Sequence, residues 1–509
     1  MNGSRAYEEF LRLAAELADL EHAEALLGWD QEVCMPAPGT PTRAQSAGTL
    51  AGIRHERLTA PALVALVERL GEQDLDPDAA ANVRELARVQ RRARRLPREL
   101  VVERARTQSL AHQAWVEARR QARFADFAPW LDKIVALRRR EAECVGYEGS
   151  PYNALLDEYE PHARAEEIGP LFARLRRRLV PLVERVAATG RHPGRGILDQ
   201  EYPVDRQEAL VRRILQDFGF DLQAGRLDVA AHPFCASIGR GDVRLTTRYS
   251  ASHLPTALFG AIHEAGHGLY EQGLPAELAG QPAGGSISLG IHESQSRLWE
   301  NIVGRSRPFW EHYLAVLQQA FPRQLGGVSV EAFYAAVNQV EPSLIRVEAD
   351  EVTYSLHILL RFELEKDLLE GRLAVADLPE SWNARLEEYL GIRPPNDADG
   401  VLQDVHWSVG LIGYFPTYTL GNLYAAQFYR QACREIPDLP EQIRQGRLLG
   451  LKGWLNERIH RHGRRLTAAQ LVQAVTGEPL QAEVFLDYLE AKFGEVYGLG
   501  PARPSPSRA

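Results

Sequence analysis

The spacing of apolar residues predicts helices over nearly the whole chain. Apolar residues recur three and four positions apart in EEFLRLAAELADL, PALVALVERLGEQ and PLFARLRRRLVPLVERVAA, all within residues 1–215. This spacing places apolar side chains on one face of a helix. The same pattern returns at about Leu254 and continues to about Phe493. Clusters of proline and glycine, such as MPAPGTPT and GYEGSPYN, predict breaks between the helices.

One segment departs from the helical pattern. In GDVRLTTRYS, residues 241–250, apolar or β-branched residues nearly alternate with polar ones, which favours a short β-strand. No repeat of fixed length and no low-complexity linker separates independent domains. We therefore expect one mostly α-helical body with a small sheet, in which residues 1–230 form an N-terminal helical lobe. Residues 231–430 form the catalytic region and residues 431–509 pack as C-terminal helices on the same body.

The segment SHLPTALFGAIHEAGHGLYEQ, residues 252–272, contains two histidines four positions apart. On a helix with about 100° per residue, His263 and His267 lie about 40° apart, away from the apolar face. Two imidazoles placed in this way can bind one zinc ion, and Glu264 can take a proton from the water that the metal activates. The alternative is a helix surface on which two histidines flank an unrelated glutamate.

A catalytic zinc site needs a third protein ligand and an open position. The metzincin continuation H-x-x-G-x-x-H is absent, because Tyr270 and Gly273 occupy its glycine and final histidine positions. The next segment, SLGIHESQSRLWENIVG, offers three candidates: His292, Glu293 and Glu300. We favour Glu293, because a glutamate from a second helix is the gluzincin arrangement. The alternative role of Glu293 is a salt bridge to Arg297, four residues later.

Composition and charge exclude several classes of protein. The hydrophobic fraction of 45% and the charged fraction of 25% are typical of soluble globular proteins, and no apolar run approaches the roughly 20 residues that span a bilayer. The N-terminal segment lacks the features of a signal peptide, which predicts a cytoplasmic protein. Four distant cysteines without a C-x-x-C pair indicate neither a disulfide framework nor a thiolate metal site: Cys34, Cys144, Cys235 and Cys433.

The charge distribution argues against a nucleic-acid-binding protein. The net charge is −9, whereas nucleic-acid affinity depends on lysine and arginine that neutralise phosphates. The basic run RVQRRARRLPR, Arg88 to Arg98, continues a helix of alternating charge. We interpret this run as solvated helix surface rather than a phosphate-binding patch.

Seven segments follow one another between about residues 26 and 423: LLGWDQEVCMP, SPYNALLDEYEP, HPFCASIGRGDVRLTTRY, HEAGH, HESQSRLWEN, LIRVEADEVTYSLHI and LQDVHWSVGLIGYFPTYTLGN. Taken together, they resemble the M32 (carboxypeptidase Taq) family of zinc carboxypeptidases. Patterns that mark the family stand at Asp242 to Thr246, at Ile345 to Asp350 and at His406-Trp407. Together, seven such segments in matching order are specific.

The resemblance implies roles for the residues already singled out. In the family, two histidines and a glutamate bind zinc, which corresponds here to His263, His267 and Glu293. Glu264 corresponds to the general base. The segment DVHWSVGLIGYFPTY supplies candidate donors to the developing oxyanion: His406 and Tyr414, with Tyr418 as a weaker candidate. The alternative role of these three residues is the packing of an aromatic-rich loop.

An exopeptidase that removes C-terminal residues must also recognise a free carboxylate, which arginine can bind bidentately. By resemblance Arg346 is the first candidate and Arg244, on the predicted strand, is the second. An alternative for Arg244 is an ion pair with Asp242 that only holds the strand. The same strand could also pair with an extended substrate backbone.

These observations predict a cytoplasmic zinc carboxypeptidase that acts on peptides. The expected fold is a large, two-lobed, mostly α-helical gluzincin with a small β-sheet beside the active-site groove. The resemblance also implies a homodimer, and cobalt can occupy the same ligands as zinc. Two alternatives stay open: a zinc oligoendopeptidase, which would not need a carboxylate-binding arginine, and a non-catalytic peptide-binding protein.

Overall fold

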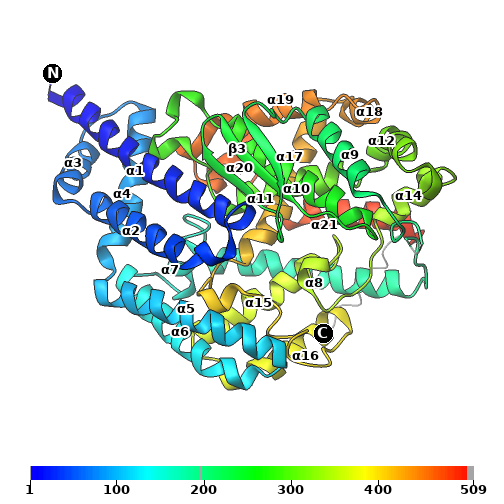
Figure 1. The fold of residues 1–509 in the computed structure, drawn as a ribbon, viewed down its shortest axis with the longest axis horizontal. Helices are drawn as coiled ribbons and strands as arrows, with labels where there is room; N and C mark the ends of the chain where they lie inside the picture. Colours follow the sequence, from blue (N-terminus) through cyan, green and yellow to red (C-terminus); the bar gives the residue numbers. More distant parts are fainter. Residues whose placement is uncertain (1, 195, 501–509) are drawn as a thin grey trace. The chain divides into compact units, whose positions relative to one another are not determined.

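The computed structural model describes residues 2–194 and 196–500, and helices dominate it (Figure 1). The chain forms two compact units, each assembled from three separated segments. The first unit comprises Met1–Leu96, Gly196–Val330 and Phe428–Pro479, and the second comprises Pro97–Arg195, Glu331–Gln427 and Leu480–Ala509. The mostly helical fold class with a small sheet is confirmed. The division into an N-terminal lobe, a catalytic region and C-terminal helices, with boundaries at residues 230 and 430, stays a prediction.

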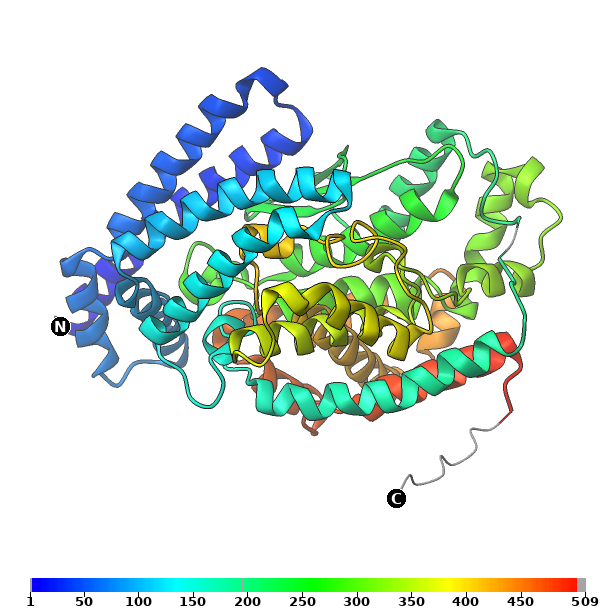
Figure 2. The same cartoon turned by 90° about the horizontal axis from the view of Figure 1, so that it is seen from below.

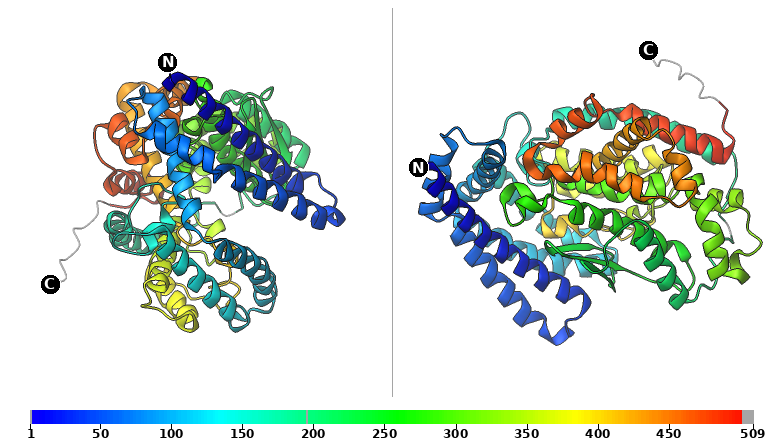
Figure 3. Two further views of the ribbon diagram at one scale, coloured as in Figure 1. Left: turned by 90° about the vertical axis from the view of Figure 1, so that its left-hand side faces the viewer. Right: turned by 90° about the horizontal axis from the view of Figure 1, so that it is seen from above.

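The first unit contains the predicted histidine helix and the sheet. Its helices are α1 (Asn2–Val33), α2 (Thr40–Leu58), α3 (Pro61–Gly71), α4 (Pro77–Arg95), α9 (Val204–Asp217), α10 (Leu254–Gly273), α11 (Leu289–Arg297), α12 (Arg307–Ala320), α13 (Pro322–Leu325), α18 (Leu439–Arg444), α19 (Leu449–Arg458) and α20 (Ala468–Thr476). A π-helical turn, Leu298–Val303, continues α11. Helices α1 and α2 lie side by side as a long hairpin (Figure 3).

The sheet has three strands, of which only the middle one was predicted. Strand β3 (Asp242–Thr247) lies between β1 (Gly225–Val229), to which it is parallel, and β2 (Cys235–Gly239), to which it is antiparallel. The predicted strand at residues 241–250 is thereby confirmed. Val243 and Leu245 are buried, so alternate positions of β3 face the core.

Two glycines let α10 approach its neighbours closely. A Cβ atom at Gly268 would lie 2.7 Å from the ring of Phe220 and 2.8 Å from the side chain of Leu245. A Cβ atom at Gly266 would lie 2.5 Å from backbone atoms of Gln295 and Ser296, on α11. Glycine is therefore required where the histidine helix crosses the sheet on one side and α11 on the other.

The second unit is built around a helix, α15 (Tyr354–Leu369), that is buried on nearly all sides and carries buried charged residues among its apolar ones. Its helices are α5 (Arg98–Gln121), α6 (Phe124–Val145), α7 (Tyr152–Leu156), α8 (Ala165–Ala187), α14 (Val330–Val337), α15 (Tyr354–Leu369), α16 (Leu378–Leu390) and α21 (Ala482–Tyr497). Most side chains of α15 are buried, as expected of a central helix. Helices α8 and α21 lie side by side (Figure 2). One of the boundaries between the two units, at Gln427 and Phe428, lies within α17 (Pro416–Glu435).

Two further predictions concern the described residues. The four cysteines are free, as their spacing indicates. None of the helices in the described ranges combines the length and the apolar character that crossing a membrane requires.

Candidate functional site

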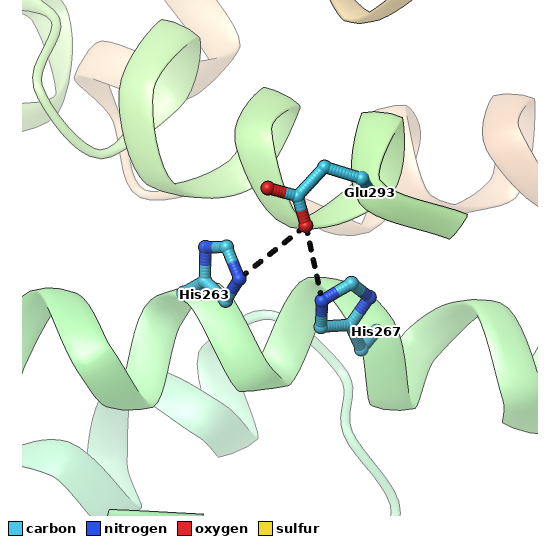
Figure 4. A group of neighbouring side chains, drawn as sticks. All are labelled: His263, His267 and Glu293. Carbon is cyan, nitrogen blue, oxygen red and sulfur yellow. Dashed lines mark ion pairs between the residues drawn. The ribbon is translucent and has the colours of Figure 1, made fainter. Parts of the chain in front are cut away.

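Three side chains predicted to bind a metal converge in the first unit. Helix α10 presents His263 and His267 from adjacent turns, and Glu293 of α11 points between them (Figure 4). The Oε2 atom of Glu293 lies 3.6 Å from Nε2 of His263 and 3.4 Å from Nε2 of His267. The three ligand atoms lie within 4.8 Å of one another. The close crossing at Gly266 is what brings the two helices near enough for this contact.

The donor set fits a small divalent metal ion. Ligand atoms that surround such an ion tetrahedrally at about 2.0–2.1 Å lie about 3.4 Å from one another. The two observed distances to Glu293 are close to this separation. Two imidazole nitrogens and a carboxylate oxygen face one another here, an arrangement that is favourable only with a cation or a proton between them. The residues present therefore fit the metal ion that sequence reasoning assigned to them.

Two of the three candidate ligands are held by a charged partner on their outer side. Nδ1 of His263 lies 2.8 Å from Oε2 of Glu300, on the π-helical turn. Nε of Arg297 donates to Oε1 of Glu293 at 2.7 Å. The salt bridge considered as an alternative role of Glu293 thus exists, but it uses the oxygen that faces away from the histidines. Glu293 can therefore keep its ion pair with Arg297 through Oε1 while Oε2 binds a metal ion.

The third candidate ligand is held by another histidine. Nδ1 of His267 lies 2.6 Å from Nδ1 of His292, and Nε2 of His292 lies 2.8 Å from Oε1 of Glu271. Burial raises the pKa of Glu271, but hydrogen bonds from His292 and Ser237 and nearby positive charge outweigh it, so the pKa lies below its usual value. Glu271 is thus a carboxylate at neutral pH, two hydrogen bonds from His267.

Glu264, the predicted general base, is buried beside the histidines. Burial raises its pKa to about 7, although His263 opposes this shift. Its carboxyl group accepts no hydrogen bond from the residues that the structure describes. A carboxyl group with a pKa near neutrality and with its oxygens available can both accept and return a proton at neutral pH.

A cavity of about 520 Å³ in the first unit is lined by none of the three candidate ligands and reaches this region only at Glu271. Glu271 lines it, together with residues of α1, α2, α4, the β2–β3 turn and the loop after α10. The wall combines acidic groups, basic groups and apolar side chains: Glu21, Glu85, Asp221, Arg54, Arg240, Lys452, Arg464, Leu17, Leu86 and Val89. Cavities of this size commonly hold small ligands.

Arg244, on β3, has the ion pair that was considered as its alternative role. Its Nε and Nη2 atoms donate to the two oxygens of Asp242 at 2.8 and 2.6 Å. Its guanidinium carbon also lies 4.2 Å from the ring centroid of Trp29. Both the fork of donors and the planar face are therefore occupied by this chain's own side chains.

Arg346 lies in a buried cluster of the second unit. Its Nε and Nη2 atoms donate to Oδ1 of Asp404 at 3.0 and 2.8 Å, and Nη1 donates to the hydroxyl of Tyr354 at 3.1 Å. Nε of Arg361, from α15, donates to Oδ2 of the same aspartate at 2.7 Å. Burial raises the pKa of Asp404, but the two guanidinium groups outweigh it and hold the pKa far below its usual range. Two buried positive charges thus share one negative charge.

The three predicted oxyanion-binding residues gather around Arg346. Nε2 of His406 lies 3.3 Å from the hydroxyl of Tyr418, and the rings of His406 and Tyr414 are 5.5 Å apart. The guanidinium carbon of Arg346 lies 5.1 Å from the centroid of Tyr418. Burial lowers the pKa of His406 to about 4, so its imidazole is neutral at pH 7 and carries a single N–H donor.

A buried glutamate ties both ends of this loop to α15. Oε1 of Glu365 accepts from the indole nitrogen of Trp407 at 2.8 Å, and Oε2 accepts from the backbone N–H of Gly413 at 3.0 Å. The hydroxyl of Tyr152 donates to Oε2 at 2.7 Å. The two anchored residues directly follow His406 and directly precede Tyr414, so one carboxylate positions both.

Sequence reasoning missed two parts of these clusters. Asp404, two residues before His406, could have been suspected as an ion-pair partner of Arg346, but no local pattern joins the two segments. The partners of the histidines were noted only as possible ligands, because the direction in which His292 and Glu300 point depends on the crossing of two helices. The structure thus groups the predicted residues into two sets, one in each unit.

Comparisons with known proteins identify the family of this chain. The model of the carboxypeptidase Taq (M32) metallopeptidase family matches residues 9–493. The chain is 46% identical to thermostable carboxypeptidase 1 of Thermus thermophilus, across 98% of this chain and 100% of the relative. It is 43% identical to thermostable carboxypeptidase 1 of Pyrococcus furiosus, across 93% of this chain and 95% of the relative.

A solved structure resembles the whole chain equally well. The crystal structure of the M32 carboxypeptidase from Deinococcus radiodurans superimposes with a TM-score of 0.95 and 42% identity. The match covers 97% of this chain and 100% of that one. The predicted family and enzyme class are thereby confirmed: the chain belongs to the carboxypeptidase Taq (M32) family of metallopeptidases and is a peptide hydrolase of the metallocarboxypeptidase class.

Proposed function

We propose that this protein is a zinc-dependent carboxypeptidase that releases C-terminal amino acids from peptides one at a time. The observation that carries the proposal is the convergence of His263, His267 and Glu293 beside the buried Glu264. Two imidazoles and one carboxylate are a ligand set typical of catalytic zinc. Cobalt accepts the same ligands and is expected to support activity as well.

The roles proposed for Glu264 and the metal ligands rest on their contacts, and those proposed for His406 and Tyr414 rest on the family resemblance. A zinc ion held by the three ligands supplies Lewis acidity, which activates water and polarises the scissile carbonyl. Glu264 accepts a proton from the attacking water and delivers it to the leaving amine, a role supported by its burial beside the ligands, which favours its protonated form. His406 and Tyr414 donate hydrogen bonds to the oxyanion as it develops. Glu365 holds the loop that carries both donors.

Arg346 is proposed to recognise the free carboxylate of the substrate. Asp404 is the one carboxylate, among the residues described, that forms an ion pair with Arg346 or Arg361, so the pair of arginines carries one excess positive charge. A substrate carboxylate would balance that charge in a site where water screens it poorly. Arg244 is the weaker candidate, because Asp242 balances its charge one to one, whereas Arg346 and Arg361 share one aspartate.

A matched pair of peptides tests this proposal against the oligoendopeptidase alternative. The same short peptide is supplied with a free and with an amidated C-terminus, and the products are identified by mass spectrometry. A carboxypeptidase releases single amino acids from the free end and leaves the amide nearly intact. Equal cleavage of both peptides at internal bonds would favour the oligoendopeptidase and contradict the proposal.

We also propose that the protein is a cytoplasmic homodimer. Four free cysteines fit a reducing compartment, and the family resemblance supports the dimer. Light scattering of the purified protein should give twice the mass of one 56.9 kDa chain. A single-chain mass at micromolar concentration would contradict the dimer without affecting the proposed reaction.

A further inference from the structure

His267 has a partner of a kind that His263 lacks. His263 faces the carboxylate of Glu300 directly, whereas His267 faces another imidazole, that of His292, with Glu271 behind it. Both members of this second arrangement are largely buried, with side-chain exposures of 17% for His292 and 13% for Glu271. The contact therefore forms inside the protein rather than on a solvated face.

The geometry allows only one arrangement of protons for neutral side chains. Nε2 of His292 lies against an oxygen of Glu271, which as a carboxylate can only accept, so this nitrogen carries a hydrogen. Nδ1 of a neutral His292 then has a lone pair. Because that nitrogen lies 2.6 Å from Nδ1 of His267, the hydrogen between them belongs to His267. The lone pair of His267 is consequently on Nε2, the atom that faces Glu293.

We propose that His292, oriented by Glu271, is a positioning residue that holds His267 in the ring orientation and tautomer required of a metal ligand. The inference rests on the proposed metal centre and deepens it. Removing the acceptor at His292 would let His267 rotate or place its hydrogen on Nε2, where it would oppose metal binding. Outer partners of metal-binding histidines typically change metal affinity by about 10- to 100-fold.

The surrounding structure holds His292 in place independently of any metal. Ser288 caps α11: its hydroxyl accepts from the N–H of Ile291 at 3.1 Å, and its backbone oxygen accepts from the N–H of His292 at 3.0 Å. The ring of Tyr270 lies edge-on to the ring of His292, with 5.2 Å between centroids. The imidazole is thus oriented by its own helix cap and by an aromatic neighbour on α10.

The test measures zinc affinity by competition with a chromophoric chelator. His292→Phe removes the acceptor and should weaken zinc binding by about 10- to 100-fold. His292→Asn keeps an acceptor oxygen near the position of Nδ1 and should recover part of the loss. Glu271→Gln removes the charge but retains an oxygen, so a smaller effect is expected. His253→Phe, the same change at a half-exposed histidine at the start of α10, should bind zinc like the wild type.

Two further readouts separate positioning from general damage. In the cobalt-loaded protein, His292→Phe should alter the visible d–d spectrum, which reports the geometry of the ligands. In a His267→Ala background, His292→Phe should cause little additional loss of affinity, because the two residues act as a unit. Equal losses in both backgrounds would overturn the proposal, as would wild-type zinc affinity in a folded His292→Phe protein.

The outcomes also distinguish this inference from the proposed function. A wild-type protein that binds one zinc ion but releases no amino acid would contradict the carboxypeptidase proposal and leave the role of His292 testable by affinity. Full zinc affinity in the His292 and Glu271 variants, with normal peptidase activity, would overturn the positioning role alone. Where His292→Phe fails to fold, His292→Asn and Glu271→Gln decide the question.

Discussion

The metal-ligand cluster of the first unit and the arginine cluster of the second bury polar groups in opposite ways. Around Glu293 the inward-facing atoms are ones that can bind a cation, namely two imidazole nitrogens and a carboxylate oxygen. Around Asp404 the inward-facing atoms are donors, from Arg346 and Arg361. These two positive charges share the single negative charge of Asp404. The first cluster is suited to a cation and the second to an anion, which are the two charges that a metal-dependent carboxypeptidase must bind.

Metal removal should have the largest effect and should affect only the first cluster. Chelation should abolish peptidase activity, because no protein group replaces the Lewis acid, and stoichiometric zinc should restore it. The measurement is activity before and after dialysis against a chelator and again after zinc is added. Elemental analysis should show that the dialysed protein is free of metal. If such protein keeps its activity, the first cluster does not act by binding a metal ion, and the contrast between the two clusters fails.

Glu264→Gln should separate metal binding from proton transfer. The amide has nearly the same shape but cannot accept the proton, so kcat should fall by about 10²- to 10⁴-fold, the range that general acid–base catalysis contributes. Zinc affinity should stay near the wild-type value, because Glu264 is not a ligand in the proposed centre. Unchanged kcat would contradict the assigned role of Glu264.

Arg346→Gln should weaken recognition of the free C-terminus. Losing one member of a buried charge pair costs about 2–5 kcal/mol, so kcat/KM for free peptides should fall by a factor of about 30 to several thousand. The matched change Arg244→Gln should have a smaller effect on the same ratio. A larger loss from Arg244→Gln would reverse the order of the two candidates. Thermal unfolding of both variants controls for damage to the fold.

The smallest expected effect concerns the anchor Glu365 and the pH dependence of stability. Burial raises the pKa of Glu365 to about 7, although hydrogen bonds from Gly413, Tyr152 and Trp407 oppose the shift. A raised pKa means that the folded state binds the proton more tightly than the unfolded state. The contribution of Glu365 to the free energy of unfolding is therefore present in full below the pKa of about 4.3 that a glutamate has in the unfolded chain. It is lost as the pH rises to about 7.

Between pH 5 and pH 8 the wild type should thus lose about 2–3 kcal/mol of stability that Glu365→Gln does not lose. The measurement is the difference between the two proteins in their denaturant unfolding curves at both pH values. A parallel dependence on pH in the two proteins would show that Glu365 stays ionised. In that case its three donors, rather than burial, determine its protonation.

Local patterns predicted two of the three candidate metal ligands because the geometry of those two is local. His263 and His267 share a helix, so a spacing of four residues places them on adjacent turns without knowledge of the fold. The segment that contains Glu293 follows after a short glycine-rich loop, and this made it a reasonable source of a third ligand. The mostly helical fold and strand β3 were predictable for the same reason, because periodicity reports the burial of a single element.

The partners of those residues were not predictable in this way. Strands β1 and β2 are short, and their pairing with β3 depends on contacts across the sheet. The family resemblance indicated that Arg346 matters, but the amino-acid pattern does not show that Asp404 links it to Arg361. Hydrogen bonds between distant segments depend on how helices pack, which local periodicity does not report.

By itself, the sequence determined the fold class, the family and the identities of the candidate ligands, because these follow from local spacing and from the order of motifs. Only the tertiary structure decided how the ligands are held. The close crossing at Gly266 turns Glu293 toward the histidines, and it places Nδ1 of His292 2.6 Å from Nδ1 of His267. Such contacts join side chains from different elements, and their distances are set by packing rather than by separation along the chain.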